Sequence, residues 1–419
     1  MTESQKIIYV YDDFDFNEPF PMGKLYVNVI KGGETYSFEY NRDWLKKTGL
    51  MISLDPELMP YPGRQYPSGK KIFGLFADSS PDRWGRILMK KRERILADRE
   101  GRKPRKLYDS DYLLGVYDET RMGGIRFKRS PEGQFLSDDK ETAVPPWANL
   151  RTLEEAARKF ESDEKSSSEK WLNQLIKPGS SLGGARPKAT VMDTRNRLWI
   201  AKFPSKNDEN DTGAWEKVVH DLAAICGLNV PGAKLEKFSS LGSTFLVLRF
   251  DRIGQKRIHF ASAMTLLGKT DGASAAEGSS YLDIVDFIKS HGAQPKKDLL
   301  ELWRRIVFNM AVTNTDDHLR NHAFILTKSG WVLSPLYDVN PVPYGDELSL
   351  NVDDEDNRID IDLAVDVAVK FGINEIDAEN YAGYILKEVR ENWMDLASGC
   401  GLMRRQIEEM KPAFRACYE

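Results

Sequence analysis

The sequence has few cysteines and no long apolar run. Its 419 residues include three cysteines, Cys226, Cys400 and Cys417, which lack a metal-binding spacing and are too few for a disulfide framework. Nowhere do about eighteen apolar residues follow one another, as a membrane helix requires. The start also lacks the basic and then apolar pattern of a signal peptide. These absences predict a soluble protein of the cytoplasm.

The sequence also lacks an excess of either charge. Sixty Lys and Arg residues stand against 64 Asp and Glu residues, and the net charge is -4. No overall charge therefore attracts nucleic acid, and any such contact has to be local. One local excess exists, because residues 82–106 hold eleven Lys or Arg and four acids. This stretch is either a solvated helix face with a basic linker or a surface for an acidic partner or nucleic acid.

The first predicted domain, residues 1–150, is a β-rich module with one basic helix. Short runs that alternate apolar and polar residues indicate strands near the start of the chain. Capping residues and a proline at 78–81 predict the start of a helix that ends at about Arg99. The pattern at 115–127 predicts strand, turn and strand. A polar segment rich in proline and glycine, 129–150, predicts a linker.

Two further domains are predicted, at 151–252 and 253–419. The first of them contains a glycine-rich loop, and its expected strands and helix are 189–192, 198–203, 214–225, 233–238 and 244–249. The second is mostly helical, with a buried helix at 299–312 that is apolar nearly all round in its second half. The predicted fold class is α+β.

A group of polar residues follows the predicted buried helix. Asp316 and Asn321 stand five apart, the spacing at which a kinase catalytic loop places its proton acceptor and a metal-binding Asn. The segment 322–334 reads as strand, turn and strand, so Asp338 is expected to return to the same edge as Asn321. A turn with a helix cap is the simpler interpretation. Charge at the end of a buried helix, however, requires compensation by a metal or ligand.

Parts of a kinase small lobe precede this group in kinase order. The glycine-rich stretch 178–188 leaves backbone N–H groups accessible to phosphate, although it matches no standard phosphate-loop pattern and a plain flexible loop is the alternative. Lys202 lies on the second strand after it and predicts an anchor for the α- and β-phosphates. Glu216 on the next helix predicts its partner. The strand that ends at 248–250 stands where a kinase hinge binds adenine.

The ordered set predicts phosphoryl transfer by positioning and charge neutralisation. Asp316 is the expected base for a substrate hydroxyl, and Asn321 and Asp338 are the expected Mg²⁺ ligands. Lys202 anchors the phosphates. His318 either orients the base or contacts phosphate, and a structural role for this histidine remains open.

These residues resemble the HipA family of bacterial serine/threonine kinase toxins. The resemblance covers about 170–345, and Phe73-Gly74-Leu75-Phe76 and Asp82-Arg83-Trp84 are weaker matches to the family's N-terminal subdomain. The specific motifs are Ser181-Leu182-Gly183-Gly184-Ala185-Arg186-Pro187-Lys188, Ile200-Ala201-Lys202-Phe203-Pro204, Gly227-Leu228-Asn229-Val230-Pro231, Arg249-Phe250-Asp251-Arg252, Asn314-Thr315-Asp316-Asp317-His318-Leu319-Arg320-Asn321 and Pro335-Leu336-Tyr337-Asp338-Val339.

The resemblance implies a kinase-like two-lobed fold with a β-rich N-terminal subdomain, a small β-lobe and an all-helical C-terminal lobe. It implies ATP and Mg²⁺ as cofactors, Asp316 as the base and Ser181 as an autophosphorylated, inactivating site, with Ser180 as the alternative. Leu248 stands where some members carry a hinge Glu. The expected ATP-binding residues are Gly183, Gly184, Ala185, Arg186, Pro187, Lys188, Lys202, Leu248, Arg249, Phe250, His318, Leu319, Arg320, Asn321, Tyr337 and Asp338.

The resemblance also implies partners. They are a DNA-binding antitoxin of the HipB type, operator DNA through the antitoxin complex, and an aminoacyl-tRNA synthetase as the substrate whose phosphorylation inhibits translation. A kinase-like protein without toxin activity that serves as a corepressor is an alternative function, and a small-molecule kinase is another.

A metal-dependent phosphoesterase is a rival of a different class. It would use Asp316, His318, Asn321 and His322 as ligands. The other three histidines, His220, His259 and His291, fall in no ligand pattern, which makes this function the weaker hypothesis. The acidic run 353–356 lacks the glycine and terminal Glu of a calcium loop and is expected to be a solvated loop.

Overall fold

The computed structural model describes residues 5–50, 53–136, 144–162, 175, 184 and 186–418. The chain forms two compact units. The first consists of Met1–Lys206 and Asp251–Ala261, and the second of Asn207–Phe250 and Ser262–Glu419. The three domain boundaries expected from the sequence, 1–150, 151–252 and 253–419, remain a prediction.

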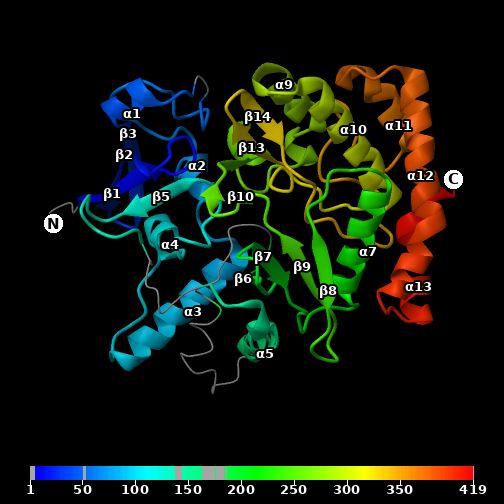
Figure 1. Ribbon diagram of the computed structural model, residues 1–419, viewed down its shortest axis with the longest axis horizontal. Helices are drawn as coiled ribbons and strands as arrows, with labels where there is room; N and C mark the ends of the chain where they lie inside the picture. The colour runs from blue at the N-terminus through cyan, green and yellow to red at the C-terminus, as the bar shows by residue number, and fades with distance from the viewer. Residues whose placement is uncertain are drawn as a thin grey trace. The chain divides into compact units, whose positions relative to one another are not determined.

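The first unit contains a five-stranded antiparallel sheet with the order β4-β3-β2-β1-β5 (Figure 1). Its strands are β1 (Gln5–Asp12), β2 (Phe20–Ile30), β3 (Gly33–Tyr40), β4 (Arg64–Gln65) and β5 (Ile125–Lys128). Aromatic rings fill one face of this sheet, since the ring of Phe76 lies 5.4 Å from Phe38 and 6.1 Å from Phe127. The early alternating runs therefore form strands, as predicted.

The helices of the first unit are α1 (Arg42–Lys47), α2 (Gly74–Asp78), α3 (Arg83–Arg99), α4 (Asp109–Gly115) and α5 (Leu150–Glu161). The predicted cap of the basic helix at 78–81 is wrong. The Ser79 and Ser80 hydroxyls instead donate back to carbonyls of α2. Asp82 caps α3, and its Oδ1 accepts a hydrogen bond of 2.8 Å from the Gly85 N–H.

The predicted strand, turn and strand at 115–127 is half wrong, because only β5 forms. Residue 115 ends α4, and the buried guanidinium of Arg121 donates to the carbonyls of Ser79 and Val116. These bonds hold the chain between α4 and β5 in turns, where a strand ladder would have left the arginine without acceptors.

Two hairpins complete the first unit. Strands β6 (Lys188–Met192) and β7 (Leu198–Lys202) pair antiparallel, with Lys188 opposite Lys202. The short strands β10 (Arg252–Ile253) and β11 (Lys256–Arg257) form the other hairpin. The Asp251 carboxylate accepts a 3.0 Å hydrogen bond from the Gly123 N–H, which joins this second hairpin to the N-terminal module.

The second unit is mostly helical. Its hairpin β8 (Ala233–Glu236) and β9 (Thr244–Leu248) follows α7 (Thr212–Ile225), and a second hairpin consists of β13 (Ala323–Thr327) and β14 (Gly330–Leu333). The main helices are α8 (Ala263–Leu266), α9 (Tyr281–His291), α10 (Pro295–Ala311), α11 (Ile361–Asp366), α12 (Glu375–Gly399) and α13 (Arg404–Met410). The predicted hairpin at 322–334 is thus present, and β12 (Phe260–Ser262) adds a third strand to its sheet, while most of the second unit is helical, in an α+β chain.

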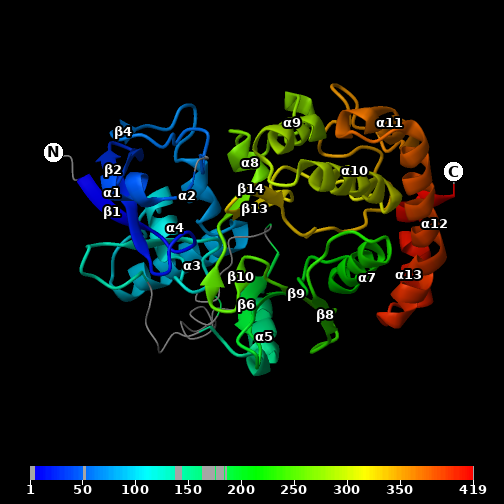
Figure 2. The same cartoon turned by 45° about the horizontal axis from the view of Figure 1, so that its top comes forward.

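Helix α10 runs through the core of the second unit. Figures 1 and 2 show α12 alongside both α7 and α10. Trp303 and Phe308 of α10 are completely buried, and the Trp303 indole N–H donates 2.7 Å to the Ala364 carbonyl of α11. The apolar second half of the sequence at 299–312 thus indicated a buried helix correctly, although α10 begins four residues earlier.

No helix in the part of the chain that the structure describes has the length and apolar character to cross a membrane.

Candidate active site

The loop after α10 carries the predicted base. Thr313 has a φ of +50°, which turns the chain out of the helix. The next residue, Asn314, donates its backbone N–H to the Asn309 carbonyl at 2.8 Å and its side-chain amide to Asn309 Oδ1 at 3.1 Å. The loop therefore begins from a point that is fixed on the buried helix.

The two neighbouring acids of this loop face opposite environments. Asp316 is exposed, whereas Asp317 is 1% exposed. The Oδ2 atom of Asp317 accepts hydrogen bonds from Tyr281 Oη at 2.6 Å, from Asn309 Nδ2 at 2.7 Å and from His322 Nε2 at 2.8 Å. Burial alone raises the pKa of Asp317, but the attraction and hydrogen bond of His322 and the bond from Tyr281 outweigh it and lower the pKa. Asp317 is thus a buried carboxylate that anchors the loop.

Asn321 closes the loop back onto its start. Its side-chain Nδ2 donates 2.8 Å to the Asp316 carbonyl, and its backbone N–H donates 2.8 Å to the His318 carbonyl. The five-residue spacing therefore produces a hydrogen-bonded loop with Asn321 buried at 3% exposure. Since the amide nitrogen is used in this way, Oδ1 is the atom of Asn321 that suits a metal ion.

The segment that carries Asp338 is joined to this loop. Tyr337 Oη donates 2.6 Å to the Arg320 carbonyl, and the Asn340 N–H donates 3.3 Å to Asn314 Oδ1. Asp338 lies between these two contacts, is half-buried and has a φ of +60°, a region that Asp tolerates better than most residues. The structure thus brings the Asp338 segment and the Asn321 loop together in one unit, as the hairpin predicted.

The two remaining loop residues of the predicted ATP-binding set contact α8 and its following turn. The Leu319 carbonyl accepts a 3.1 Å hydrogen bond from the Met264 N–H, and Leu319 is buried. The Arg320 guanidinium lies 3.3 Å from Asp271 Oδ1 in a partly exposed ion pair. These contacts hold the loop from the side of α8.

The predicted hinge residues lie in the same unit. The ring of Phe250 packs on the ring of Tyr337, with 5.6 Å between centroids and 38° between planes. Leu248 ends β9 and donates its N–H to the Gly232 carbonyl at 2.8 Å, and Arg249 is buried. Phe250 and Tyr337, which both belong to the predicted ATP-binding set, are therefore neighbours in space.

Glu216 lies on α7 and is 4% exposed. The start of its helix is fixed, because Asp211 Oδ1 accepts hydrogen bonds from the N–H groups of Ala214 and Ser243. Gly213 is required here, since an added Cβ would lie 2.1 Å from the Ser243 carbonyl oxygen. The predicted partner of Lys202 is therefore on a helix that is held against the start of β9.

In the first unit, Lys202 ends β7 and is 7% exposed. Its strand neighbour Lys188 has a different environment from the one expected of a loop residue. The Lys188 ammonium lies 3.1 Å from Asp82 Oδ2, each side chain is 1% exposed, and the same ammonium donates to the Gly184 carbonyl at 3.1 Å. Lys188 therefore links the end of the glycine-rich segment to the start of α3.

The glycine-rich segment is described only in part. Gly184, Arg186 and Pro187 belong to the described residues, and Pro187 accepts the Phe203 N–H at 2.9 Å. Four predicted residues lie outside the described residues, namely Ser180, Ser181, Gly183 and Ala185.

The predicted Mg²⁺ ligands suit that ion by their chemistry. Asn321 and Asp338 offer an amide oxygen and a carboxylate oxygen, and Mg²⁺ prefers oxygen ligands and is commonly held by one or two carboxylates together with phosphates. The buried amide of Asn321, oriented by its bond to the Asp316 carbonyl, is consistent with this role. Within the described ranges, no group of three His, Cys, Asp or Glu side chains is arranged to hold a metal.

One nitrogen of a predicted phosphoesterase ligand is already used in a hydrogen bond. His322 is completely buried, and its Nε2 is bonded to the Asp317 carboxylate. Since an ionised carboxylate only accepts hydrogen bonds, this nitrogen carries the proton and cannot bind a metal. His318 is half-buried and donates its backbone N–H to the Asp316 carbonyl at 3.1 Å, and its side-chain role stays a prediction.

Comparison with known protein families adds to this geometry. The profile of the HipA-like C-terminal domain matches residues 180–393, and that of the HipA N-terminal domain matches residues 21–103. The chain belongs to the HipA family. The resemblance seen in the motifs is therefore confirmed, and it extends to the N-terminal module.

Several proteins are similar to this HipA-family chain. "Putative kinase Y4mE" of Sinorhizobium fredii is 28% identical over 50% of this chain and 46% of its own length. A "Putative kinase" of Haemophilus influenzae is 33% identical over 39% of this chain and 54% of its own length. The serine/threonine-protein kinase toxin HipA of Shewanella oneidensis is 25% identical over 58% of this chain and 64% of its own length. The chain thus spans about half the length of the first two relatives.

A solved structure has the same fold. It is the complex of HipA, HipB and operator DNA from Shewanella oneidensis, with a TM-score of 0.68 and 16% identity, and the match covers 98% of this chain and 96% of the other. The HipA-family chain therefore has the kinase-like fold that the resemblance implied.

Two structural features of this HipA-family chain were missed from the sequence. One is the anchoring role of Asp317, and the other is the buried pair of Asp82 and Lys188. The sequence predicted no role for Asp317, which lies next to the predicted base. The one sequence feature that could have indicated its role is its position shortly before a buried strand. Asp82 belongs to the motif Asp82-Arg83-Trp84, but no sequence pattern connects it with Lys188, which lies about a hundred residues later.

Proposed function

We propose that this chain is an ATP- and Mg²⁺-dependent kinase that phosphorylates serine or threonine of a protein substrate. The observation that carries this proposal is the contrast between Asp316 and Asp317. An exposed carboxylate at the end of a buried helix is held in place by a hydrogen-bonded anchor one residue away. Such a fixed, solvent-facing carboxylate suits a base that meets a substrate hydroxyl.

Each residue has a stated role in the proposed reaction. Asp316 accepts the proton of the substrate hydroxyl as the hydroxyl oxygen attacks the γ-phosphorus, and ADP leaves. Asn321 and Asp338 would hold Mg²⁺, which would neutralise charge on the phosphates. The kinase order of parts makes Lys202 the predicted anchor of the α- and β-phosphates and Glu216 its predicted partner. His318 orients the base or contacts phosphate.

The remaining predicted residues bind ATP around this centre. The backbone at Leu248, Arg249 and Phe250 would hold the adenine, and the packing of Phe250 on Tyr337 supports an aromatic wall there. The glycine-rich segment with Gly184, Arg186 and Pro187 would cover the phosphates. We further propose, from the family resemblance, that Ser181, or Ser180 beside it, is autophosphorylated. The phosphate would add about two negative charges, which would compete with ATP for that segment and inactivate the kinase.

The cellular role that we propose is that of a toxin. A relative named as a serine/threonine-protein kinase toxin and a fold shared with a HipA chain in complex with HipB and operator DNA support it. The partner would be a HipB-type antitoxin that contacts operator DNA. The substrate would be an aminoacyl-tRNA synthetase in the cytoplasm.

The test begins with protein treated with a phosphatase, which is then removed. Labelled ATP and Mg²⁺ are added with and without a panel of aminoacyl-tRNA synthetases. We expect label on the chain and on one synthetase, and a loss of about 10²- to 10⁴-fold in Asp316→Asn. Asp354→Asn, in an exposed acidic loop, is the matched control. Absence of label on both proteins would contradict the kinase hypothesis and favour the corepressor without toxin activity. Label on a small molecule alone would favour a small-molecule kinase.

A further inference from the structure

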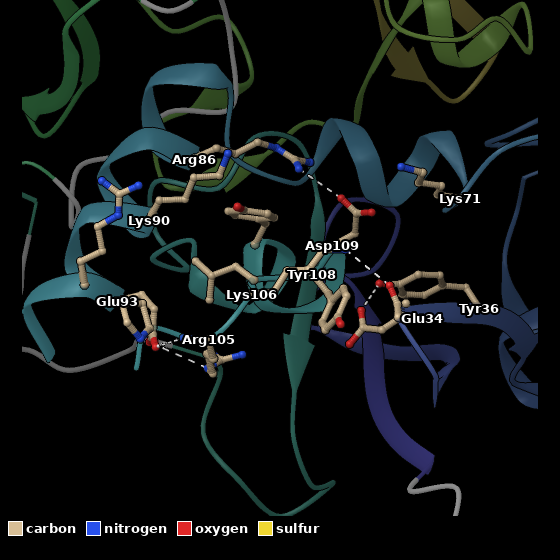
Figure 3. A pocket seen from close by; sticks show the side chains of 16 residues that line it. Glu34, Tyr36, Lys71, Arg86, Lys90, Glu93, Arg105, Lys106, Tyr108 and Asp109 are labelled. Carbon is tan, nitrogen blue, oxygen red and sulfur yellow. Dashed lines mark hydrogen bonds and ion pairs between the residues drawn. The ribbon is translucent and has the colours of Figure 1, made fainter. Parts of the chain in front are cut away.

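The first unit contains a cleft of about 770 Å³ that none of the predicted active-site residues lines. Three segments surround it, namely the β2–β3 turn with the start of β3, helix α3, and residues 104–109 with the start of α4 (Figure 3). Lys71 lies at one end of the cleft, and Arg86 and Lys90 extend over it from α3. The cleft therefore lies within the basic stretch that the kinase hypothesis left without a role.

Bases outnumber acids in this cleft by six to three. The three acids are Glu34, Glu93 and Asp109, and the six bases are Lys71, Arg86, Lys90, Arg94, Arg105 and Lys106. Each of the acids already has a partner. Asp109 lies 3.1 Å from Arg86, Glu93 accepts 2.9 Å from the Arg105 N–H, and Glu34 accepts 2.7 Å from the Ser110 hydroxyl. The three acids thus already interact with residues that form the walls of the cleft.

Several of the bases are not neutralised. Across the described ranges, Lys71, Lys90 and Arg94 make no ion pair, and all three are exposed. Lys106 contacts only uncharged groups, since its ammonium lies 5.2 Å from the Tyr108 ring centroid and 3.4 Å from the Gly32 carbonyl. A concave surface with this excess positive charge attracts an anionic ligand.

The spacing of the bases indicates what kind of anion fits. Arg86, Lys90 and Arg94 stand four residues apart on α3, so successive side chains lie on one face and rise by about 6 Å per step. Arg86 is fixed, because its guanidinium also donates to the Pro81 carbonyl at 3.3 Å and lies over the Tyr112 ring. A row of regularly spaced cations matches a ligand whose negative charges repeat along a chain.

An acidic protein segment is the less favoured ligand. Stable protein interfaces depend on apolar or aromatic anchors that enter pockets. The lining of this cleft includes only two aliphatic side chains, Pro104 and Leu107. Two of its three tyrosines, Tyr36 and Tyr112, are buried, and the half-buried Tyr108 already has the Lys106 ammonium over its ring. A phosphate backbone needs no such anchor, since charge neutralisation and counterion release drive its binding.

We propose that the cleft between α3 and residues 104–109 binds the sugar–phosphate backbone of nucleic acid. The contact is independent of base sequence, because the exposed Lys71, Lys90 and Arg94 make no ion pair in the described part of the chain, and cations that no partner orients suit phosphates rather than base edges. The proposal goes beyond the proposed kinase function, in which DNA is met only through the antitoxin. It gives the toxin chain a direct contact of its own.

The test measures the fluorescence anisotropy of labelled oligonucleotides with the full chain. A DNA duplex, a single DNA strand and an RNA strand of the same length are titrated at several salt concentrations. For the unaltered chain we expect the logarithm of the association constant to fall linearly with the logarithm of the salt concentration. The expected slope is about −0.9 for each phosphate contact on a duplex and about −0.7 for each contact on a single strand. The three probes decide which nucleic acid binds best.

The variants are Lys90→Gln with Arg94→Gln, and the same pair with Lys71→Gln. We expect the magnitude of the salt slope to fall by about one for each Lys or Arg that is removed. Arg92→Gln with Lys46→Gln is the matched control, because both residues are exposed and neither lines the cleft. Circular dichroism checks that every variant is folded.

Three outcomes would overturn the proposal. They are no salt-dependent binding by the unaltered chain, an equal loss in the control pair, and tighter binding to a poly-glutamate peptide than to an oligonucleotide with the same number of charges, which would indicate an acidic protein partner. The result is separable from the kinase test. Asp316→Asn should bind the oligonucleotides normally, and Lys90→Gln with Arg94→Gln should label normally with ATP.

Discussion

Nε2 of His322 lies 2.8 Å from Oδ2 of Asp317, and both side chains are at most 1% exposed. The contact joins the residue next to the proposed base with the residue that precedes β13. Tyr281 of α9 and Asn309 of α10 donate to the same oxygen. Three separate elements thus determine where the loop lies, and the exposed Asp316 takes its position from the buried Asp317.

Replacement of this anchor should cost both stability and activity. In Asp317→Ala three buried donors lose their acceptor, and since each buried donor left unsatisfied costs about 1–3 kcal/mol, the expected total is about 3–5 kcal/mol. We expect that decrease in the free energy of unfolding in urea, and labelling with ATP should fall further than the folded fraction does. Asp354→Ala, at an exposed position of the acidic loop, is the control. Full activity in folded Asp317→Ala would show that Asp316 needs no anchor.

Asp338 should determine the Mg²⁺ requirement. A weaker oxygen ligand in Asp338→Asn should raise the Mg²⁺ concentration needed for half-maximal labelling, because one negative charge is lost from the site. Titration of labelling with MgCl₂ at fixed ATP measures this change. Asp346→Asn, an acid on the exposed rim of the same unit, should leave the titration unchanged. An unaltered Mg²⁺ curve in Asp338→Asn would contradict the ligand assignment.

The buried pair of Asp82 and Lys188 should couple strongly. Asp82→Ser keeps a capping oxygen for α3 and removes the charge, so Lys188 is left buried without its partner. We expect a loss of about 3–5 kcal/mol in that variant and a smaller loss when Lys188→Met is added.

The exposed pair of Arg405 and Glu409 provides the comparison, since solvent screens that pair and removal of one partner there should change the stability far less. Urea unfolding of the unaltered chain, Asp82→Ser, Lys188→Met and the double variant gives the coupling energy of the pair. Additive losses at Asp82 and Lys188 would show that their 3.1 Å contact contributes no coupling energy.

His259 should make the stability depend on pH. It is 2% exposed and stacked on Phe14 at 4.6 Å, and burial lowers its pKa to about 3. Below about pH 6.5 the unfolded chain binds a proton that the folded state excludes, so stability falls as the pH drops from 6.5 toward 3.

The expected loss from this histidine is about 2 kcal/mol at pH 5 relative to pH 7. His259→Phe removes the titrating ring, so the difference in unfolding free energy between the two proteins should narrow or reverse as the pH falls. Exposed His291→Phe is the control. A difference that stays constant from pH 7 to 5 would contradict this prediction.

Much of the fold follows from local patterns. The alternation near the start, the apolar helix before the Asn314–Asn321 loop and the hairpin at 322–334 all form as the sequence predicts. The spacing of Asp316 and Asn321 likewise closes into a hydrogen-bonded loop. These features succeed because strand and helix periods, and a five-residue loop, depend on neighbours in the chain.

The sequence by itself determined the kinase-like order of parts and the family. Only the tertiary structure decided that Asp317 is buried against Tyr281, 36 residues earlier, while Asp316 faces solvent. It likewise decided that Lys188 pairs with Asp82 and that Asp82, rather than the residues before it, caps α3. The physical reason is the same in each case. A charged side chain takes the partner that packing places within reach, and no period in the sequence records a contact between distant segments.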